Sequence, residues 1–143
     1  MPTTFRARSR FQPPRLDPLA LHGLYFVVTG LWPVVNLRSF YAVTGPKREG
    51  WLVQTFGLLV AALGLGMLRS RAAPDRRGAV RLGVLTGLAL ALADVLFVAR
   101  GRIRPVYLLD AVTEVAAAVA YAVDGRTGDG RTDGCLAMTE LAR

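Results

Sequence analysis

Four long runs of apolar residues, separated by short stretches rich in arginine, glycine and proline, dominate the pattern of this chain. Each run has roughly the 20 residues that a helix needs to cross the hydrocarbon core of a bilayer. Because lipid cannot hydrogen-bond to an exposed backbone, each run is expected to be helical. The pattern therefore predicts an all-α polytopic membrane protein, folded as a bundle of four transmembrane helices. The predicted spans cover residues 18–37, 51–68, 82–99 and 105–123.

Proline, aspartate and glycine mark where these helices begin and end. Asp17 directly precedes Pro18, which puts a capping side chain before a proline in the first helical turn. Pro33 lies inside the first run, where it removes one backbone hydrogen bond and is expected to kink the helix. The pair Asp124 and Gly125 is expected to end the fourth helix. The chain is thus divided into a basic cytoplasmic leader (1–17), a membrane domain (18–123) and a flexible cytoplasmic tail (124–143).

The positions of lysine and arginine predict the orientation, because these residues are more common in cytoplasmic loops. With the N-terminus inside, twelve of the 18 basic residues lie in cytoplasmic segments and six lie in the outer ones. This asymmetry predicts that both termini are cytoplasmic. Arginine greatly outnumbers lysine, and alanine and glycine are abundant, which is typical of a GC-rich bacterial gene. We therefore expect the chain in a bacterial inner membrane.

The overall composition narrows the classes of partner. The chain has 143 residues, of which 52% are hydrophobic, too many for a disordered protein. A net charge of +8 would suit a nucleic-acid binder. The basic residues, however, stand at the ends of the apolar runs and not across a folded face, so no nucleic-acid partner is expected. The expected partners are the lipid bilayer and either another membrane protein or further copies of this chain.

Three carboxylates lie inside the predicted spans: Asp94 in the third, and Asp110 and Glu114 in the fourth. Ionisable groups in a bilayer are costly and face the interior of a bundle. Asp110 and Glu114 are about one helical turn apart, so they share a face. Asp94 shares its face with Gly83 and Gly87, whose spacing is typical of close helix packing. All three carboxylates are therefore expected to meet inside the bundle.

Two amides extend this expected group, because Asn36 ends the first span and Gln54 begins the second on the same outer side. All four helices would then send a polar side chain to one region of the outer half. One interpretation is a hydrogen-bonded network that only fixes the register of the helices. The other is a site for a proton, a cation or a small polar ligand. The predicted polar cluster consists of Asn36, Gln54, Asp94, Asp110 and Glu114.

His22 lies one turn into the first helix, near the expected cytoplasmic side and far from the acidic residues. His22, Thr29 and Asn36 recur at intervals of seven and share a helix face, which predicts a polar track across the membrane. We expect no metal site, because His22 has no cysteine or carboxylate near it and the single Cys135 stands apart in the tail. His22 is instead expected to bond to a neighbouring helix.

The first half of the membrane domain carries a resemblance to a known family. Residues 23–68 contain GLYFVVTGLWPVV, then a loop, then the glycine-rich helix GLLVAALGLGML. In this hydropathy and glycine placement the chain resembles small DoxX-like bacterial membrane proteins. The resemblance implies a four-helix bundle and, as for some members, an association with respiratory-chain quinone oxidoreductases. It covers about half of the chain and carries over no catalytic residue.

Three classes of function stay open at this point, and none of them implies a named cofactor or a catalytic residue. The first is an accessory or structural subunit of a membrane complex. The second is a proton- or cation-coupled carrier of a small molecule that uses the intramembrane carboxylates. The third is a membrane enzyme that acts on a lipid or quinone, with buried carboxylates as acid and base.

Overall fold

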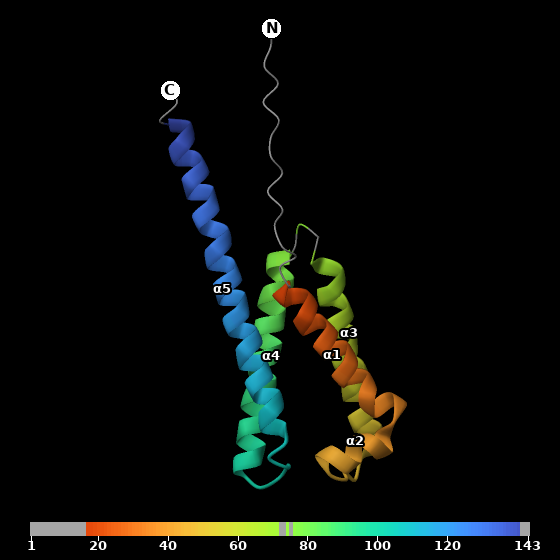
Figure 1. Ribbon diagram of the computed structural model, residues 1–143. Helices are drawn as coiled ribbons and strands as arrows, with labels where there is room; N and C mark the ends of the chain where they lie inside the picture. Colours follow the sequence, from red (N-terminus) through yellow and green to blue (C-terminus); the bar gives the residue numbers. More distant parts are fainter. Residues whose placement is uncertain (1–16, 72–73, 75, 141–143) are drawn as a thin grey trace.

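The computed structural model describes residues 17–71, 74 and 76–140, and it describes side chains as far as Gly125. All regular structure in these residues is helical, as predicted (Figure 1). The five helices are α1 (Pro18–Val35), α2 (Leu37–Thr44), α3 (Gly50–Ser70), α4 (Arg76–Ala99) and α5 (Tyr107–Glu140).

Three of these helices, α1, α3 and α4, are long and apolar enough to cross a membrane. They correspond to the first three predicted spans, and they identify the chain as a membrane protein. The fourth predicted span forms the beginning of α5, which is not among the three. Asp110 and Glu114 interrupt its apolar run, and Asp124 follows directly after Val123.

The first span is shorter than predicted and is followed by a helix that the sequence did not suggest. α1 ends at Val35, two residues after Pro33. Asn36 leaves helical geometry (φ −146°, ψ 81°), and its side chain accepts a hydrogen bond from the backbone N–H of Ser39 in the first turn of α2. Asn36 is therefore a cap between two helices.

The helices form two antiparallel pairs, α1 with α3 and α4 with α5. In Figure 1 the two pairs converge towards the beginning of α1 and diverge towards α2 and the loop after α4. At the converging end a small apolar core of Leu19, Phe26, Met67 and Tyr121, with Val60 of α3, joins α1, α3 and α5. The pairs therefore share an interface mainly around the first half of α1.

The α1–α3 interface depends on glycines that let the two backbones touch. A Cβ atom on Gly30 would lie 2.5 Å from the carbonyl oxygen of Gly57 and 2.6 Å from the backbone nitrogen of Ala61. Gly23 and Gly64 repeat this contact two turns away. Because the obstructing atoms belong to the backbone, a larger residue could enter only if the helices moved apart.

The predicted end of the fourth helix at Asp124 and Gly125 differs from the structure, in which α5 continues to Glu140. A glycine that ends a helix usually takes a positive φ. Within the described residues only Gly45 and Gly101 do so, and Gly125 remains helical. The flexibility of the tail stays a prediction. The basic leader, apart from Asp17, lies outside the described residues.

Candidate functional site

The imidazole of His22 and the carboxylate of Glu114 form a buried pair between α1 and α5. His22 Nε2 lies 2.9 Å from Glu114 Oε2. The exposed fraction is 4% for His22 and 1% for Glu114, the lowest of any charged residue among those described. Phe26 packs edge-on against the imidazole, with the ring centroids 4.4 Å apart. A charged or polar pair this deeply buried is costly unless each member is hydrogen-bonded.

Tyr121 completes the hydrogen bonds of the imidazole. Its hydroxyl lies 2.9 Å from His22 Nδ1, on the opposite side of the ring from Glu114. A carboxylate only accepts and a neutral histidine has one donor nitrogen. Both contacts are satisfied when the Tyr121 O–H donates to Nδ1 and Nε2–H donates to Glu114. Tyr121, His22 and Glu114 therefore form a continuous hydrogen-bonded chain.

Two glycines of α4 provide the space for the hydrogen-bonded side chains of Tyr121, His22 and Glu114. A Cβ atom on Gly83 would lie 3.4 Å from the Tyr121 hydroxyl and 3.6 Å from His22 Nδ1. A Cβ on Gly87 would collide with the carboxylate of Glu114. The sequence motif that predicts close helix packing thus also accommodates polar side chains from two other helices.

The other two carboxylates of the predicted polar cluster continue the polar region beyond Glu114. Asp94, which is 9% exposed, interacts with both Asp110 and Glu114. The hydroxyl of Tyr25 on α1 donates a hydrogen bond to Asp110. Asp94 Oδ2 and Glu114 Oε1 are buried and have no hydrogen-bond partner among the described residues. Asp94 therefore lies within electrostatic range of both other carboxylates, and two carboxylate oxygens stay unsatisfied among the described residues.

Sequence reasoning placed His22 far from the acidic residues, and this was wrong. The number of residues between each side chain and its helix end suggests different depths, but the helix pairs are staggered so that His22 lies level with Glu114. The expectation that His22 bonds to a neighbouring helix is met by both of its partners. The missing signal was the relative height of α1 and α5, which no pattern within a single helix contains.

The remaining predicted members do not join this cluster. Asn36 is exposed and caps α2. Thr29 donates to the backbone carbonyl of Tyr25 in its own helix, at 2.7 Å, so it does not extend a polar track from His22. Gln54 is partly buried near the beginning of α3, and no hydrogen bond of its side chain is found in the described part of the chain.

One arginine closes the converging end of the molecule. Arg76 Nη2 donates to Asp17 Oδ1 at 2.8 Å and to Asp124 Oδ2 at 3.1 Å. It thereby joins α4 to the beginning of α1 and to α5, one turn from Tyr121. Asp17 also caps α1, as predicted, by accepting from the backbone N–H of Leu19. The ion pairs themselves were not expected from the sequence.

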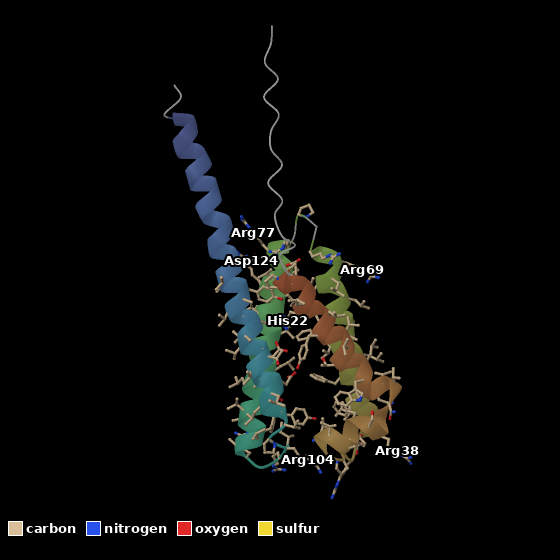
Figure 2. The ribbon with its side chains drawn as sticks, in the orientation of Figure 1. His22, Arg38, Arg69, Arg77, Arg104 and Asp124 are labelled. Carbon is tan, nitrogen blue, oxygen red and sulfur yellow. The ribbon has the colours of Figure 1, made fainter. Side chains whose placement is uncertain are left out.

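Basic and aromatic side chains meet at the diverging end. Figure 2 shows Arg38 and Arg104 at this end, with Arg69, Arg77 and Asp124 at the opposite end and His22 between them. Arg104 Nη1 lies 3.4 Å from the carbonyl oxygens of Ala42 and Val43. Lys47 Nζ lies 5.2 Å from the centroid of the Tyr107 ring, within the range of a cation–π contact.

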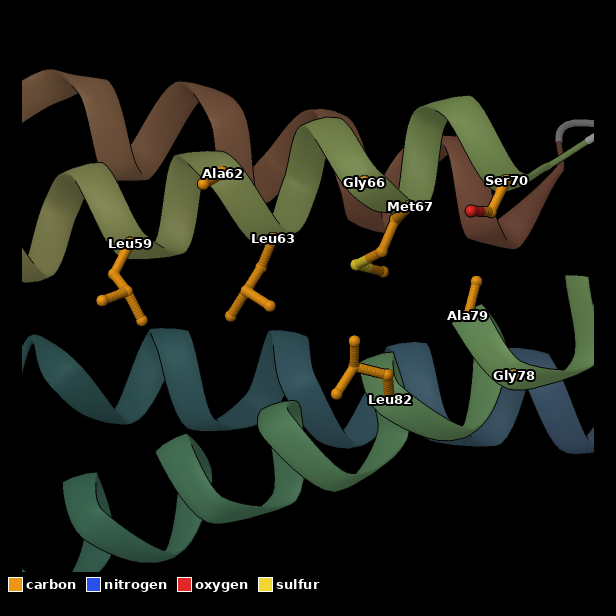
Figure 3. A pocket seen from close by; sticks show the side chains of 9 residues that line it. All are labelled: Leu59, Ala62, Leu63, Gly66, Met67, Ser70, Gly78, Ala79 and Leu82. Carbon is orange, nitrogen blue, oxygen red and sulfur yellow. The ribbon is translucent and has the colours of Figure 1, made fainter. Parts of the chain in front are cut away.

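A groove lies between α3 and α4. It has a volume of about 450 Å³ and an apolar lining with several small residues (Figure 3). Gly66 and Gly78 contribute to it, and neither would meet any atom within 4 Å if it carried a Cβ. Met67 of α3 and Leu82 of α4 also line it.

Within the described residues no three histidine, cysteine, aspartate or glutamate side chains converge as a metal ion requires. Comparisons with protein-family models, with curated proteins and with solved structures find no match to this chain. The resemblance to DoxX-like proteins therefore stays a prediction.

Proposed function

We propose that the protein is a small proton-coupled membrane carrier, in which His22 and Glu114 hold and pass the proton. The observation that carries this proposal is the buried 2.9 Å contact between an imidazole and a carboxylate. Histidine and glutamate both exchange protons readily, and this distance suits direct proton transfer. A network that only fixed helix register would leave no reason for unpartnered carboxylate oxygens beside it.

The proposed path follows the interface between the two helix pairs. Tyr121 lies at one end of the hydrogen-bonded chain and Glu114 at the other. Asp94 and Asp110 then lead towards the diverging end of the molecule. With neutral His22 and ionised Glu114 the pair carries one negative charge, and one further proton on either group makes it neutral. Because isolated charges are costly in a bilayer, the pair favours taking up that proton and can pass it on.

The proposal includes a fourth membrane span, formed by residues 107–123 of α5. Its acidic side chains face α1 and α4, whereas its other side presents apolar side chains to the surroundings. Leu109 and Val112 are 69% and 67% exposed, and Val115, Val119 and Val123 are exposed as well. Such a face suits lipid. With four spans and the arginine asymmetry, both termini lie in the cytoplasm of a bacterium and the bundle lies in its inner membrane.

Reconstitution tests the proposed function. The full chain is placed in liposomes that enclose a pH-sensitive dye, and proton entry is followed after an acid jump outside. Glu114→Gln keeps the shape of the side chain and a hydrogen bond to His22 but cannot exchange a proton, so proton entry should fall at least about tenfold. Glu49→Gln is the matched control, because Glu49 is exposed and its side chain bonds only to Trp51 among the described residues. Equal proton entry in wild type and Glu114→Gln would contradict the proposal.

The groove between α3 and α4 supports a second candidate function, that of an accessory subunit of a membrane complex. Small residues such as Gly66 and Gly78 allow a helix of another protein to approach closely. Purification in mild detergent without crosslinking tests this candidate. A partner in fixed ratio that is lost in Gly66→Leu would support it, and a chain that purifies alone would not.

A further inference from the structure

The groove between α3 and α4 has about the length of one membrane leaflet. Along α3 its lining extends from Leu59 to Ser70, which is about 16 Å at 1.5 Å per residue. This is about half of the hydrocarbon core of a bilayer, which is about 30 Å thick. The lining ends at Ser70 and Gly78, close to the end of α3 and the beginning of α4. The groove therefore extends from one surface of the membrane to about the middle of the bilayer.

The groove is apolar, and the protein leaves open space in it. Figure 3 shows the side chains of Leu59 and Met67 directed towards α4, and that of Leu82 directed towards α3. A Cβ atom on Gly66 would meet nothing within 4 Å. The polar side chain in the lining is that of Ser70, at the surface end of the groove. The free volume of about 450 Å³ therefore suits a flexible hydrocarbon chain.

Arginines are concentrated at the surface end of the groove. Between residues 66 and 82 the sequence has five arginines and a single acidic residue, Asp75. Arg76 pairs with Asp17 and Asp124. The other four are exposed and have no ion-pair partner among the described residues: Arg69, Arg71, Arg77 and Arg81. This end of the groove thus carries positive charge that the described residues do not neutralise.

Two of these arginines are covalent neighbours of the groove lining. Arg69 directly precedes Ser70 on α3, and Arg77 directly precedes Gly78 on α4. Figure 2 shows both arginines at the same end of the molecule. Long basic side chains near the end of a membrane helix extend towards the headgroup region. A phosphate group at that level therefore lies within reach of arginines from both helices.

We infer that the groove is a binding site for a phospholipid with an anionic headgroup. One acyl chain lies along the apolar lining, and the phosphate lies between Arg69 and Arg77. Basic pockets between membrane helices recognise anionic headgroups in this way. A helix of another protein would cross the whole bilayer, whereas the groove covers about half of it. This site is independent of the proposed proton-coupled function. Its lipid would contact both helix pairs, because α3 belongs to one pair and α4 to the other.

Native mass spectrometry of the full chain in detergent tests for this lipid. The probes are phosphatidylglycerol, which is anionic, and phosphatidylcholine, which is zwitterionic, with identical acyl chains. We expect one phosphatidylglycerol to bind per chain, and more tightly than phosphatidylcholine. The double variant Arg69→Gln/Arg77→Gln should weaken phosphatidylglycerol binding about 30-fold, or about fivefold for each arginine. The matched control is Arg38→Gln/Arg48→Gln, which removes two exposed arginines outside the groove and should not change binding.

A second variant tests the apolar part of the site. Gly66→Leu places a side chain in the groove, and the open space at this position allows the chain to fold. It should weaken phosphatidylglycerol binding at least about tenfold, because leucine takes the place of the acyl chain. Gly125→Leu is the matched control, since Gly125 also has open space around it and does not line the groove. The two variants act on different parts of the lipid, so each tests the site by itself.

Four results would overturn the lipid site. Equal binding of the two lipids would exclude selection of an anionic headgroup. Unchanged binding in Gly66→Leu would exclude the groove as the place of the acyl chain. Displacement of the lipid by an equal concentration of inorganic phosphate would assign the arginines to free phosphate. A protein partner in fixed ratio that is lost in Gly66→Leu, without retained phosphatidylglycerol, would assign the groove to the second candidate function.

Discussion

The interface between α1 and α3 and the interface of α4 with α1 and α5 both depend on glycines, but different groups fill the space that these glycines leave. At Gly30 and Gly57 the space is filled by the backbone of the partner helix. At Gly83 and Gly87 it is filled by side chains, those of Met67, Tyr121 and His22 at Gly83 and those of Glu114 and His22 at Gly87. The first interface is therefore a rigid contact, whereas the second holds groups that can exchange protons.

Spacing alone therefore does not define the role of a small residue in a membrane helix. Backbone contact gains dispersion energy along the whole α1–α3 pair, and it leaves no freedom for side chains. The side chains in the second interface are buried and hydrogen-bonded to one another, and histidine and glutamate can each gain or lose a proton. The predictions below test the two roles separately, with glycines in open positions as controls.

The largest expected loss of stability follows Gly30→Ala. The new methyl group would lie 2.5 Å from a backbone oxygen and 2.6 Å from a backbone nitrogen, so α1 and α3 must separate. We expect a cost of about 3 kcal/mol, measured as the free energy of unfolding in mixed detergent micelles. Gly66→Ala on α3 is the control, because nothing lies within 4 Å of its Cβ position. Equal stability of the two variants would contradict the rigid contact.

Gly87→Ala should have a smaller effect on stability and a larger one on proton entry. Its methyl group meets the end of the Glu114 side chain, which can rotate away, so the cost should be about 1–2 kcal/mol. The displaced carboxylate would lose its bond to His22, and proton entry into liposomes should fall. Gly78→Ala on the same helix has open space around it and should change neither quantity. Unchanged proton entry in Gly87→Ala would show that proton entry does not require the His22–Glu114 contact.

The two interfaces also differ in how far the sequence predicts them. The apolar runs predicted the helical class and the positions of α1, α3 and α4, because length and hydropathy are properties of single segments. The shared face of Asp110 and Glu114 was equally readable, since it depends on spacing within one helix. The contact of His22 with Glu114 was not, because it depends on the stagger between two helix pairs.

Asn36 illustrates the same limit on a smaller scale. As a polar residue at the end of an apolar run, it fitted a buried cluster as well as a helix cap. The choice depends on whether the chain continues as a loop or begins a new helix, and no strong sequence pattern marks the beginning of α2. The structure resolves this through the bond between Asn36 and Ser39.

Tyr121→Phe should cost about 1 kcal/mol, because it removes one buried hydrogen bond to His22 and keeps the ring in the apolar core. Tyr41→Phe is the matched control. The Tyr41 hydroxyl is also buried, but it has no hydrogen-bond partner in the described part of the chain, so its removal should not destabilise the protein. Thermal unfolding of both variants in detergent measures the difference. A larger loss of thermal stability in Tyr41→Phe than in Tyr121→Phe would contradict a stabilising hydrogen bond between Tyr121 and His22.

The smallest effect is expected at the closed end, from Arg76→Gln. The arginine side chain is 36% exposed, and its partners Asp17 and Asp124 are 30% and 41% exposed. Ion pairs this close to water contribute at most about 1 kcal/mol, and salt screens them. Wild type and variant should therefore differ slightly in unfolding midpoint at low salt and converge at high salt. Arg77→Gln removes the neighbouring charge, which is exposed, and it should show no salt-dependent difference. If the gap between wild type and Arg76→Gln stayed constant with salt, the arginine would act through packing of its methylene groups and not through its two aspartates.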